Sequence, residues 1–373
     1  MDNKSILISG AGIAGLALAY WLKKYGFKPT VIEFAPKLRE GGYAIDFFGA
    51  GFDVAEKMGI LSDLEKTDLR IKEVVFVDER NRKQGALNAF QIRGLVNGRF
   101  YNVLRSDLAR VISGHLDSDI EFIFGDTITK IEQTGNEVMV SFQSGKERTF
   151  DLVVGADGLH SNVRNLVFGN ESQYEKYFGF YVAAYTISDH GKLFEKDSLF
   201  KTYTVPGKQV NTYSLKEDKL ASLFIWSSAR KYSYDHHDIM RQKQSLRNEF
   251  RNVGWECPTL LEGLDSADDF YFDPISQIKM DHWSNGRVTL VGDACDCPSL
   301  LSGQGSTLAM VAAYILAGEL KVSTGNYKMA FRQYENTFKP FIDKKQKLAK
   351  LFAVSYVPKN NFGIWVRNTF TNA

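Results

Sequence analysis

The sequence predicts an α/β protein with a Rossmann-like domain, an inserted β-sheet domain and a C-terminal helix. A strand, a glycine-rich turn, a helix and a second strand open the chain within residues 5–33. The stretch from about Tyr177 to Phe272 mixes strand-like and helical patterns and lacks the glycines of its flanks. Lys328–Phe352 has the apolar spacing of a long amphipathic helix. These three features together predict the fold class.

The opening unit has the most regular pattern. Ser5–Ser9 is expected to form a buried strand, and Ala14–Tyr25 is expected to form a helix. Gly26 follows as a helix stop, and Pro29–Glu33 is expected to form the next strand.

Further elements are expected along the rest of the chain. Helices are expected near residues 51–58, 105–115 and 303–320, and strands at residues 120–124, 127–133, 137–142, 149–154 and 287–291. Gly135 and Asn136 mark a hairpin turn between two of these strands.

The same pattern divides the chain into parts. Residues 1–72, 97–176 and 275–325 are expected to build the Rossmann-like domain. Residues 73–96 and 177–274 are expected to build a second, substrate-facing domain. Residues 326–373 are expected to form a C-terminal helical region.

The composition is that of an ordinary globular protein. Of the 373 residues, 44% are hydrophobic and 24% are charged, and the net charge is +2. No sustained basic run with aromatic spacing occurs, so nucleic acid is not an expected partner. The start of the sequence does not resemble a signal peptide, and no apolar run of membrane-spanning length is expected. We therefore expect a cytoplasmic protein without a membrane partner.

The cysteines argue against redox and metal sites. Cys257, Cys295 and Cys297 form no disulfide framework, which favours a reducing compartment. The absence of a CxxC or CxxxxC pair argues against a disulfide reductase. His236 and His237 are adjacent and would not face each other on a helix, so a solvated surface is the simpler interpretation. No metal site is predicted.

The first motif that carries chemistry is the glycine-rich run Gly10–Gly15. Gly10 makes the tight turn after the strand, Gly12 lets backbone N–H groups approach a pyrophosphate, and Gly15 allows close helix–strand packing. Glu33 ends the next strand, at the usual distance for accepting hydrogen bonds from a ribose. The complete unit favours dinucleotide binding over a bare turn, but it does not separate FAD from NAD.

Two later segments distinguish FAD from NAD. Gly155–Arg164 follows a strand, and Val291–Ala294 ends another strand shortly before Gly303–Gly305. An aspartate at a strand's carboxyl end can bind ribityl hydroxyls, and a helix N-terminus beyond it can stabilise negative charge on a reduced flavin. Either segment alone could equally be an aspartate that caps a helix. All three motifs together, in this order, favour a flavin.

In this order and at these intervals, the motifs resemble the class A flavin monooxygenases, the p-hydroxybenzoate hydroxylase family. The resemblance covers nearly the whole chain. It implies bound FAD, with a phosphate contact from Arg105, a ribityl contact from Asp293 and a segment around Asp157 and Arg164 that serves both FAD and a nicotinamide cofactor. The FAD-binding residues that it implies are Gly10, Gly12, Ile13, Ala14, Gly15, Glu33, Phe34, Arg39, Asp46, Arg105, Asp157, Asp293, Gly303, Gln304, Gly305 and Ser306.

Within that family, the sequence looks most like the tetracycline destructases. The matching stretches are Lys37–Asp46, Asp269–Met280 and Gly292–Leu320. The resemblance implies that Arg39, Gly41, Gly42 and Asp46 lie near the flavin, with Asp46 as a candidate catalytic residue at the edge of the active site. By pattern alone, Asp46 could equally be a turn or cap residue.

The sequence departs from the family at two places. Many members have Ala-His after the Gly-Asp pair, whereas this chain has Cys295, Asp296 and Cys297. Asp296 could change the charge near the flavin or face solvent. Ala183 and Ala184 stand where some relatives place polar substrate contacts, which weakens the case for tetracycline itself.

The resemblance implies a monomeric enzyme that uses NADPH or NADH and O2. It would hydroxylate a polycyclic or phenolic molecule through a flavin C4a-hydroperoxide, with tetracycline antibiotics among the candidate substrates. Two alternatives stay open. One is an FAD-dependent reductase or oxidase on the same scaffold, and the other is a flavoprotein that sequesters an aromatic ligand without turnover.

Overall fold

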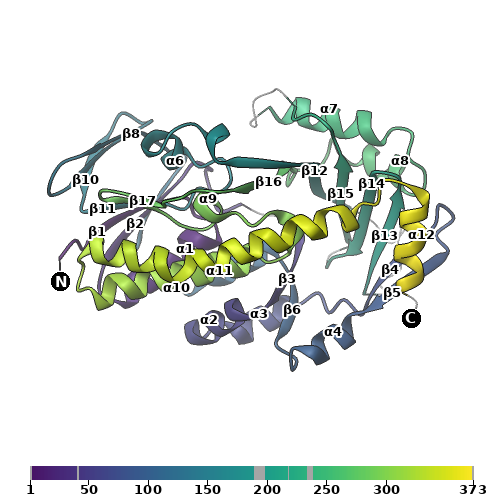
Figure 1. Ribbon diagram of the computed structural model, residues 1–373, viewed down its shortest axis with the longest axis horizontal. Coiled ribbons are helices and arrows are strands. Elements are labelled where there is room, and N and C mark those ends of the chain that lie inside the picture. Colours follow the sequence, from purple (N-terminus) through teal and green to yellow (C-terminus); the bar gives the residue numbers. More distant parts are fainter. Residues whose placement is uncertain (1, 40–41, 189–197, 217, 233–237, 372–373) are drawn as a thin grey trace.

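Two large sheets lie side by side along the long axis of the molecule (Figure 1). The computed structural model describes residues 2–39, 42–188, 198–216, 218–232 and 238–371. The N-terminus lies at the end of the molecule formed by the first sheet, and the C-terminus lies beside the second.

The first sheet is the predicted Rossmann-like sheet. It has the order β17-β18-β11-β1-β2-β7, and all neighbours are parallel except β17 and β18. Its central strands are buried, as expected for a parallel sheet covered on both faces. The strands are β1 (Ser5–Ser9), β2 (Lys28–Glu33), β7 (Glu121–Phe124), β11 (Leu152–Gly155), β17 (Ser284–Asn285) and β18 (Val288–Leu290).

Three long helices pack in and around this domain. They are α1 (Ile13–Lys24), α10 (Gly305–Val322) and α11 (Tyr327–Tyr356), and α10 packs between the other two. Contrary to the sequence expectation, α10 is long and apolar enough to cross a membrane by length and composition. Half of it is buried inside the protein, so its apolar residues are explained by its place in the core.

The second sheet is mostly antiparallel. Its order is β16-β12-β15-β14-β13-β4-β5, and only β13 and β4 run parallel. The strands are β4 (Glu73–Val77), β5 (Lys83–Asn88), β12 (Glu175–Ser188), β13 (Leu199–Val205), β14 (Lys208–Ser214), β15 (Lys219–Ser227) and β16 (Tyr271–Ile278).

The two faces of the second sheet have different neighbours. One face, with Tyr181 and Phe224, packs with residues of α7 (Ile239–Phe250) and α8 (Cys257–Glu262) in one hydrophobic core. The other face, with Val182 and Ile225, packs in a smaller cluster with Tyr43 of the first domain. The second face is therefore the side that meets the first domain.

Smaller elements complete the chain. A separate ribbon of β3 (Ala44–Phe48) and β6 (Phe100–Leu104) lies between the two large sheets (Figure 1). The remaining strands form a three-stranded sheet of β8 (Ile128–Gln133), β9 (Val138–Phe142) and β10 (Glu147–Phe150). The remaining helices are α2 (Ala50–Met58), α3 (Leu61–Thr67), α4 (Ala89–Leu95), α5 (Arg105–Gly114), α6 (Asn162–Val167), α9 (Asp293–Asp296) and α12 (Asn361–Phe370), with 3-10 turns at Glu171–Gln173 and Leu300–Ser302.

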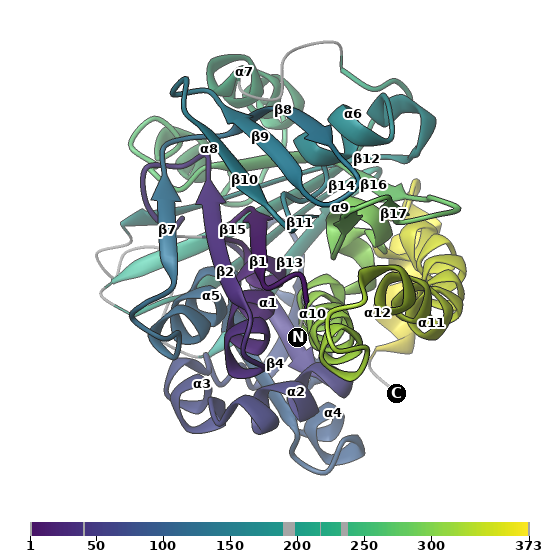
Figure 2. The same ribbon diagram turned by 90° about the vertical axis from the view of Figure 1, so that its left-hand side faces the viewer.

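The C-terminal region differs from the single helix expected. α11 runs along much of the molecule, and α12 then packs near β5 and β13 of the second sheet (Figures 1 and 2). Gln346 of α11 donates to the carbonyl of Ile278 at 2.8 Å, and Gln277 donates to the carbonyl of Gln346 at 2.8 Å. The long helix therefore fastens the end of β16 by backbone and side-chain hydrogen bonds.

One strand prediction was wrong. The strand expected at residues 149–154 is two strands, β10 and β11, which belong to different sheets. Asp151 separates them, and its carboxylate accepts a hydrogen bond from the backbone of Ser5 at 2.8 Å. The domain boundaries expected at 176 and 274 stay predictions; β12 begins at Glu175 and β16 ends at Ile278. His236 and His237 lie outside the described residues.

Candidate functional site

The glycine turn after β1 has no room for side chains. Gly10 has φ +106°, and a Cβ atom at this position would lie 2.6 Å from the carbonyl oxygen of Ala156. A Cβ atom on Gly15 would lie 1.9 Å from the carbonyl oxygen of Gly10. Both glycines are therefore required by close backbone packing, as the sequence predicted.

The start of α1 is open toward a ligand. Gly12 is its N-cap, no side chain caps the helix, and no acidic residue lies in the first turn. The first N–H groups of a helix lack intrahelical partners and attract anions. Ile13 and Ala14, also predicted to contact the cofactor, are buried in this first turn. The backbone, rather than any side chain, makes this end of the helix suitable for a pyrophosphate.

Arg105 lies beside this turn. Its Nη2 is 3.6 Å from the point where a Cβ of Gly12 would be, and its Cβ is 3.7 Å from the same point on Gly42. Among the described residues, no carboxylate or carbonyl forms an ion pair or hydrogen bond with its guanidinium. A half-buried cation without a protein partner, next to free helix N–H groups, fits a bound phosphate.

Glu33 connects the end of β2 to the glycine turn. Its Oε2 accepts a hydrogen bond from the backbone of Ala11 at 2.8 Å, and its Oε1 accepts one from Ala35 at 3.0 Å. Each carboxylate oxygen keeps a further lone pair, so the residue can still accept from ribose hydroxyls. Phe34 follows it and is 54% exposed.

The third motif forms a second open helix N-terminus. α10 begins at Gly305, and its N-cap Gln304 makes no side-chain capping bond. Gly303 has φ +63° and is exposed, and Ser306 lies in the first turn. A Cβ on Gly305 would lie 3.8 Å from Oδ1 of Asp293, so this carboxylate lies beside the open end of the helix.

Asp293 is enclosed by protein although solvent still reaches it. Burial raises the pKa of its carboxyl, and the positive charge of Arg105 opposes that rise. Asp293 and Arg105 therefore lie near each other, between the two open helix ends. A flavin dinucleotide needs this combination of a phosphate-binding end, a ribityl acceptor and a second helix end at the ring.

The second motif is mainly structural. Oδ2 of Asp157 accepts from the backbone of Val163 at 3.0 Å, and its Oδ1 accepts from the hydroxyl of Ser161. Arg164 is fully buried and donates to the carbonyls of Ala294 and Leu159 at 2.8 and 2.7 Å. Arg164 therefore connects the second motif to the third, and a direct cofactor contact for Asp157 stays a prediction.

The residues after β2 are only partly placed. Arg39 is exposed, and Gly42 has φ +115° beside Arg105. Gly41 lies outside the described residues. Asp46 is solvent-accessible on β3, yet the surrounding protein removes enough water from its carboxyl to raise its pKa. Asp46 is therefore accessible to solvent and is also surrounded closely by protein atoms.

The structure shows where the three residues that depart from the family pattern, 295–297, lie. Asp296 is 1% exposed, so it does not face solvent. Burial raises the pKa of Asp296 well above its usual range, and the nearby Asp293 adds to the rise. The burial of Asp296 therefore disfavours a negative charge at this position beside the flavin motif. Cys295 and Cys297 are buried free thiols.

Sequence reasoning missed five residues at the junction of the two domains. They are Tyr43, Asn102, His160, Tyr271 and Asp273, and none of them was predicted as a site residue. Tyr43 and Tyr271 pack with ring centroids 5.4 Å apart, one from each domain. His160 donates toward Asp273 at 2.8 Å and toward Glu171 at 3.0 Å. His160 lies within the second motif, and the two tyrosines and Asp273 lie in the stretches that match the tetracycline destructases, but nothing in the sequence pairs His160 with β16.

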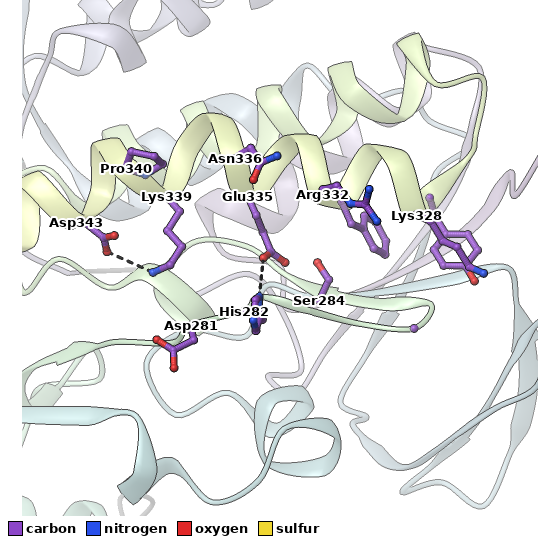
Figure 3. A pocket seen from close by; sticks show the side chains of 13 residues that line it. Asp281, His282, Ser284, Lys328, Arg332, Glu335, Asn336, Lys339, Pro340 and Asp343 are labelled. Carbon is purple, nitrogen blue, oxygen red and sulfur yellow. Dashed lines mark hydrogen bonds and ion pairs between the residues drawn. The ribbon is translucent and has the colours of Figure 1, made fainter.

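A separate surface pocket of about 720 Å³ lies between α11 and the segment around β17 (Figure 3). Its lining includes His282, whose Nδ1 is 3.6 Å from Oε2 of Glu335, and Lys339, whose Nζ is 3.4 Å from Asp343. It shares no residue with the three motifs. Among the described residues, no group of three or more His, Cys, Asp or Glu side chains could hold a metal ion.

Comparisons with known proteins identify the family. A family model described as FAD binding domain matches residues 3–336. A flavin-dependent monooxygenase from Legionella longbeachae is 37% identical over 372 residues, which cover 99% of this chain and 90% of the relative. The crystal structure of tetracycline destructase Tet(51) is 33% identical, with a TM-score of 0.88 over 99% of this chain and 95% of that one. Tetracycline destructase Tet(55) is 34% identical, with a TM-score of 0.86 over 100% and 96%.

The residues present fit the cofactor that this family binds. The two uncapped helix ends, the Arg105 guanidinium, which forms no ion pair with another described residue, and the enclosed Asp293 would supply what the phosphates and the ribityl chain require. The chain therefore belongs to the FAD-binding monooxygenase family, and it is a flavin-dependent monooxygenase, an oxidoreductase that binds FAD.

Proposed function

We propose that this monooxygenase uses NAD(P)H and O2 to hydroxylate a polycyclic or phenolic small molecule. The observation that carries the proposal is the aromatic lining of the domain junction. Tyr43 and Tyr271 pack there at 5.4 Å, and Phe200 stacks on Tyr213 at 5.3 Å. Flat aromatic surfaces from two domains suit a planar ring system.

The protein's part in the reaction is to position the substrate and exclude water. FAD, when bound and reduced, supplies the chemistry that activates oxygen. The junction side chains would hold the target ring near the flavin, because reaction requires close and aligned atoms. The packing of Tyr43 and Tyr271 across the domain boundary also limits the access of water to that region.

The relatives suggest tetracyclines as candidate substrates, and two alanines bear on this point. Ala184 packs on the face of the second sheet that meets the first domain, whereas Ala183 packs on the opposite face with α7 and α8. Ala184 is therefore part of a buried apolar cluster at the junction, where some relatives have a polar contact. This supports a polycyclic substrate class that is wider than tetracycline.

The proposal can be tested by product mass. The protein is reconstituted with FAD and incubated aerobically with NADPH or NADH and one of three probes: tetracycline, anhydrotetracycline or a simple phenol. We expect a probe to accelerate NAD(P)H oxidation and to gain one oxygen atom. Unchanged probe masses across this panel contradict the proposed substrate class. A product formed without added oxygen favours the reductase or oxidase alternative.

A matched pair of variants assigns the activity to the junction. Tyr271→Leu removes an aromatic ring from the junction and is expected to raise KM for the accepted probe. Tyr327→Leu removes a ring from the separate surface pocket and is expected to leave KM unchanged. Equal effects of the two substitutions would contradict binding at the junction.

A further inference from the structure

Four side chains form a hydrogen-bonded relay from Glu171 through His160 and Asp273 to Tyr271. Nδ1 of His160 lies 3.0 and 3.1 Å from the two carboxylate oxygens of Glu171, and its Nε2 lies 2.8 Å from Oδ1 of Asp273. An ionised carboxylate only accepts hydrogen bonds, so each ring nitrogen must carry a proton to bond its partner. His160 is therefore an imidazolium held between two carboxylates.

The two carboxylates of the relay have different surroundings. Glu171 also accepts from the buried guanidinium of Arg164 at 2.8 Å, and Nζ of Lys231 lies 3.9 Å from it. Burial would raise the pKa of Glu171, but its three cationic neighbours outweigh this effect and lower the pKa. Asp273 has His160 as its one ion-pair partner among the described residues. The proton on Nδ1 therefore faces a well-neutralised anion, whereas the proton on Nε2 faces a carboxylate with no second cation.

Asp273 continues the relay into the domain junction. Its carboxylate forms a side-chain hydrogen bond with Tyr271, which lies two residues earlier on the same face of β16. The ring of Tyr271 packs on Tyr43 with centroids 5.4 Å apart. Burial raises the pKa of Tyr43, and Arg105 and Asp293 lie near enough for their charges to change it. The relay therefore ends close to the residues that we assign to the phosphates and the ribityl chain of FAD.

The proposed reaction takes up one proton in each turnover. NAD(P)H supplies a hydride, one oxygen atom of O2 enters the product, and the other oxygen atom leaves as water. NAD(P)H, H+, O2 and the substrate are thus converted to NAD(P)+, the hydroxylated product and water. A reaction space that excludes water needs a path through the protein for this proton.

We propose that His160 is the proton reservoir for this reaction, and that Asp273 and the hydroxyl of Tyr271 carry its proton to the domain junction. The inference rests on the proposed function, and Glu171 acts in it as a positioning residue for the imidazole ring. Burial would lower the pKa of His160, but the hydrogen bonds of Asp273 and Glu171 raise it to about 10. The reservoir is therefore filled at neutral pH.

Each step of the relay moves one proton between two atoms. The Nε2–H bond of His160 breaks, its electron pair stays on the nitrogen, and an O–H bond forms on Asp273. Asp273 then donates this proton to the oxygen of Tyr271, while the hydroxyl of Tyr271 turns and gives its own proton to an oxygen atom at the junction. His160 is left neutral with its proton on Nδ1. Because its side chain is 19% exposed, a proton from solvent can refill it before the next turnover.

The first test needs no turnover and measures the protonation of His160 by NMR. The six histidines of the FAD-loaded protein are labelled with 15N, and the signal of His160 is identified by its absence in His160→Gln. At pH 8, we expect the chemical shifts of an imidazolium. Tyr271→Phe should move the Nε2–H signal, because Asp273 then loses its second hydrogen-bond donor.

The second test follows the reoxidation of reduced FAD in the protein, which needs neither substrate nor NAD(P)H. Dithionite reduces the flavin, the protein is mixed with O2, and flavin absorbance reports the rate. Anionic reduced FAD, H+ and O2 give oxidised FAD and H2O2, so one proton is again taken up. The wild-type rate should stay constant up to about pH 9, because His160 keeps its proton there.

Two variants should lose this constant rate. In His160→Gln, solvent becomes the proton source, so the rate should fall about tenfold for each pH unit above neutrality. Tyr271→Phe keeps the aromatic ring but interrupts the relay, and it should show the same fall. Tyr185→Phe is the matched control, because its hydroxyl donates to the carbonyl of Leu260 on the other face of the second sheet. It should keep the wild-type rate profile and the His160 signal.

The outcomes are distinct from those of the product assay. The proposal is overturned if His160 is neutral at pH 8, or if Tyr271→Phe keeps the constant wild-type rate. It is also overturned if Tyr185→Phe loses that constant rate together with Tyr271→Phe, because a general loss of packing would then explain both. A failed product assay with the expected NMR and reoxidation results instead removes the proposed substrate class and leaves the relay in place.

Discussion

The cofactor-binding region and the domain junction are built from different parts of the chain. The first uses glycines and the uncapped ends of α1 and α10, so backbone atoms and missing side chains define its shape. The second uses side chains from β3, β6, β14 and β16, which come together only in the folded protein. A site formed by the backbone should therefore lose ligand binding when one carbon atom is added to a glycine. A site formed by side chains should instead lose part of its affinity or stability with each substitution.

The largest effect is expected for Gly15→Ala. The new Cβ would lie 1.9 Å from the carbonyl oxygen of Gly10, so the turn or the helix must move. We expect a loss of about 3 kcal/mol or more in the free energy of unfolding, together with loss of FAD binding. Urea unfolding of the apoprotein and flavin absorbance measure the two effects.

Gly114→Ala is the matched control for that substitution. Gly114 is the last residue of α5, and no neighbouring part of the protein lies within 4 Å of the point that its Cβ would occupy. The same chemical change should be neutral or slightly stabilising there, by about 0.5 kcal/mol. If both variants bind FAD equally well, the glycine turn is not the rigid element that we describe.

The second prediction concerns Arg105, whose guanidinium lies beside the glycine turn. Arg105→Gln should weaken FAD binding about tenfold to a hundredfold, which corresponds to the loss of a hydrogen bond to a charged group. Since its guanidinium has no ion-pair partner among the described residues, the apoprotein should keep its melting temperature. Fluorescence titration of FAD and thermal melts measure both.

Arg110→Gln is the control for the loss of charge. Arg110 lies on the same helix, and its exposed guanidinium pairs with Asp107. Its removal should change FAD affinity by less than about twofold. A similar loss of affinity in both variants would mean that general electrostatics, and not a phosphate contact, explains the effect of Arg105.

The third prediction addresses the junction through His160. Burial alone would lower the pKa of His160, but the hydrogen bonds and charges of Asp273 and Glu171 outweigh it and raise the pKa to about 10. A histidine with a raised pKa stabilises the folded state fully below its unfolded pKa of about 6.5, and this contribution is lost as pH rises toward about 10.

His160→Gln should therefore lower the free energy of unfolding by about 2 kcal/mol in mildly acidic solution and by much less near pH 10, where His160 loses its proton. Unfolding measured across that pH window tests the sign. His282→Gln is the control, because His282 is 84% exposed and should give no pH-dependent difference. A stability gap for His160→Gln that grows with pH would reverse our assignment of a charged bridge between the domains.

The sequence predicted the first region much better than the second. β1, α1 and β2 were expected within one residue at most of their ends, because the glycine turn and the apolar periodicity are local features. The pairing of β3 with β6 joins Asp46 to Asn102 across 56 positions, and no local pattern encodes that contact. His160 was within a predicted motif, but its partner Asp273 comes from another domain.

The smallest effect on stability is expected for α12, which packs on the second sheet. The sequence pattern did not separate this helix from the preceding one. Arg367 donates to Gln209 at 3.0 Å and to Thr204 at 2.9 Å, and its guanidinium lies 4.4 Å from the ring centroid of Phe76. Arg367→Ala should cost about 1 kcal/mol of unfolding free energy, since these are partly buried contacts at an edge of the molecule. Phe370→Ala on the same helix should stay within about 0.5 kcal/mol, because Phe370 is 78% exposed. Equal losses of stability in the two variants would show that apolar residues hold α12 in place. A large effect of Arg367→Ala on FAD affinity would mean that the second sheet and the cofactor-binding region are coupled.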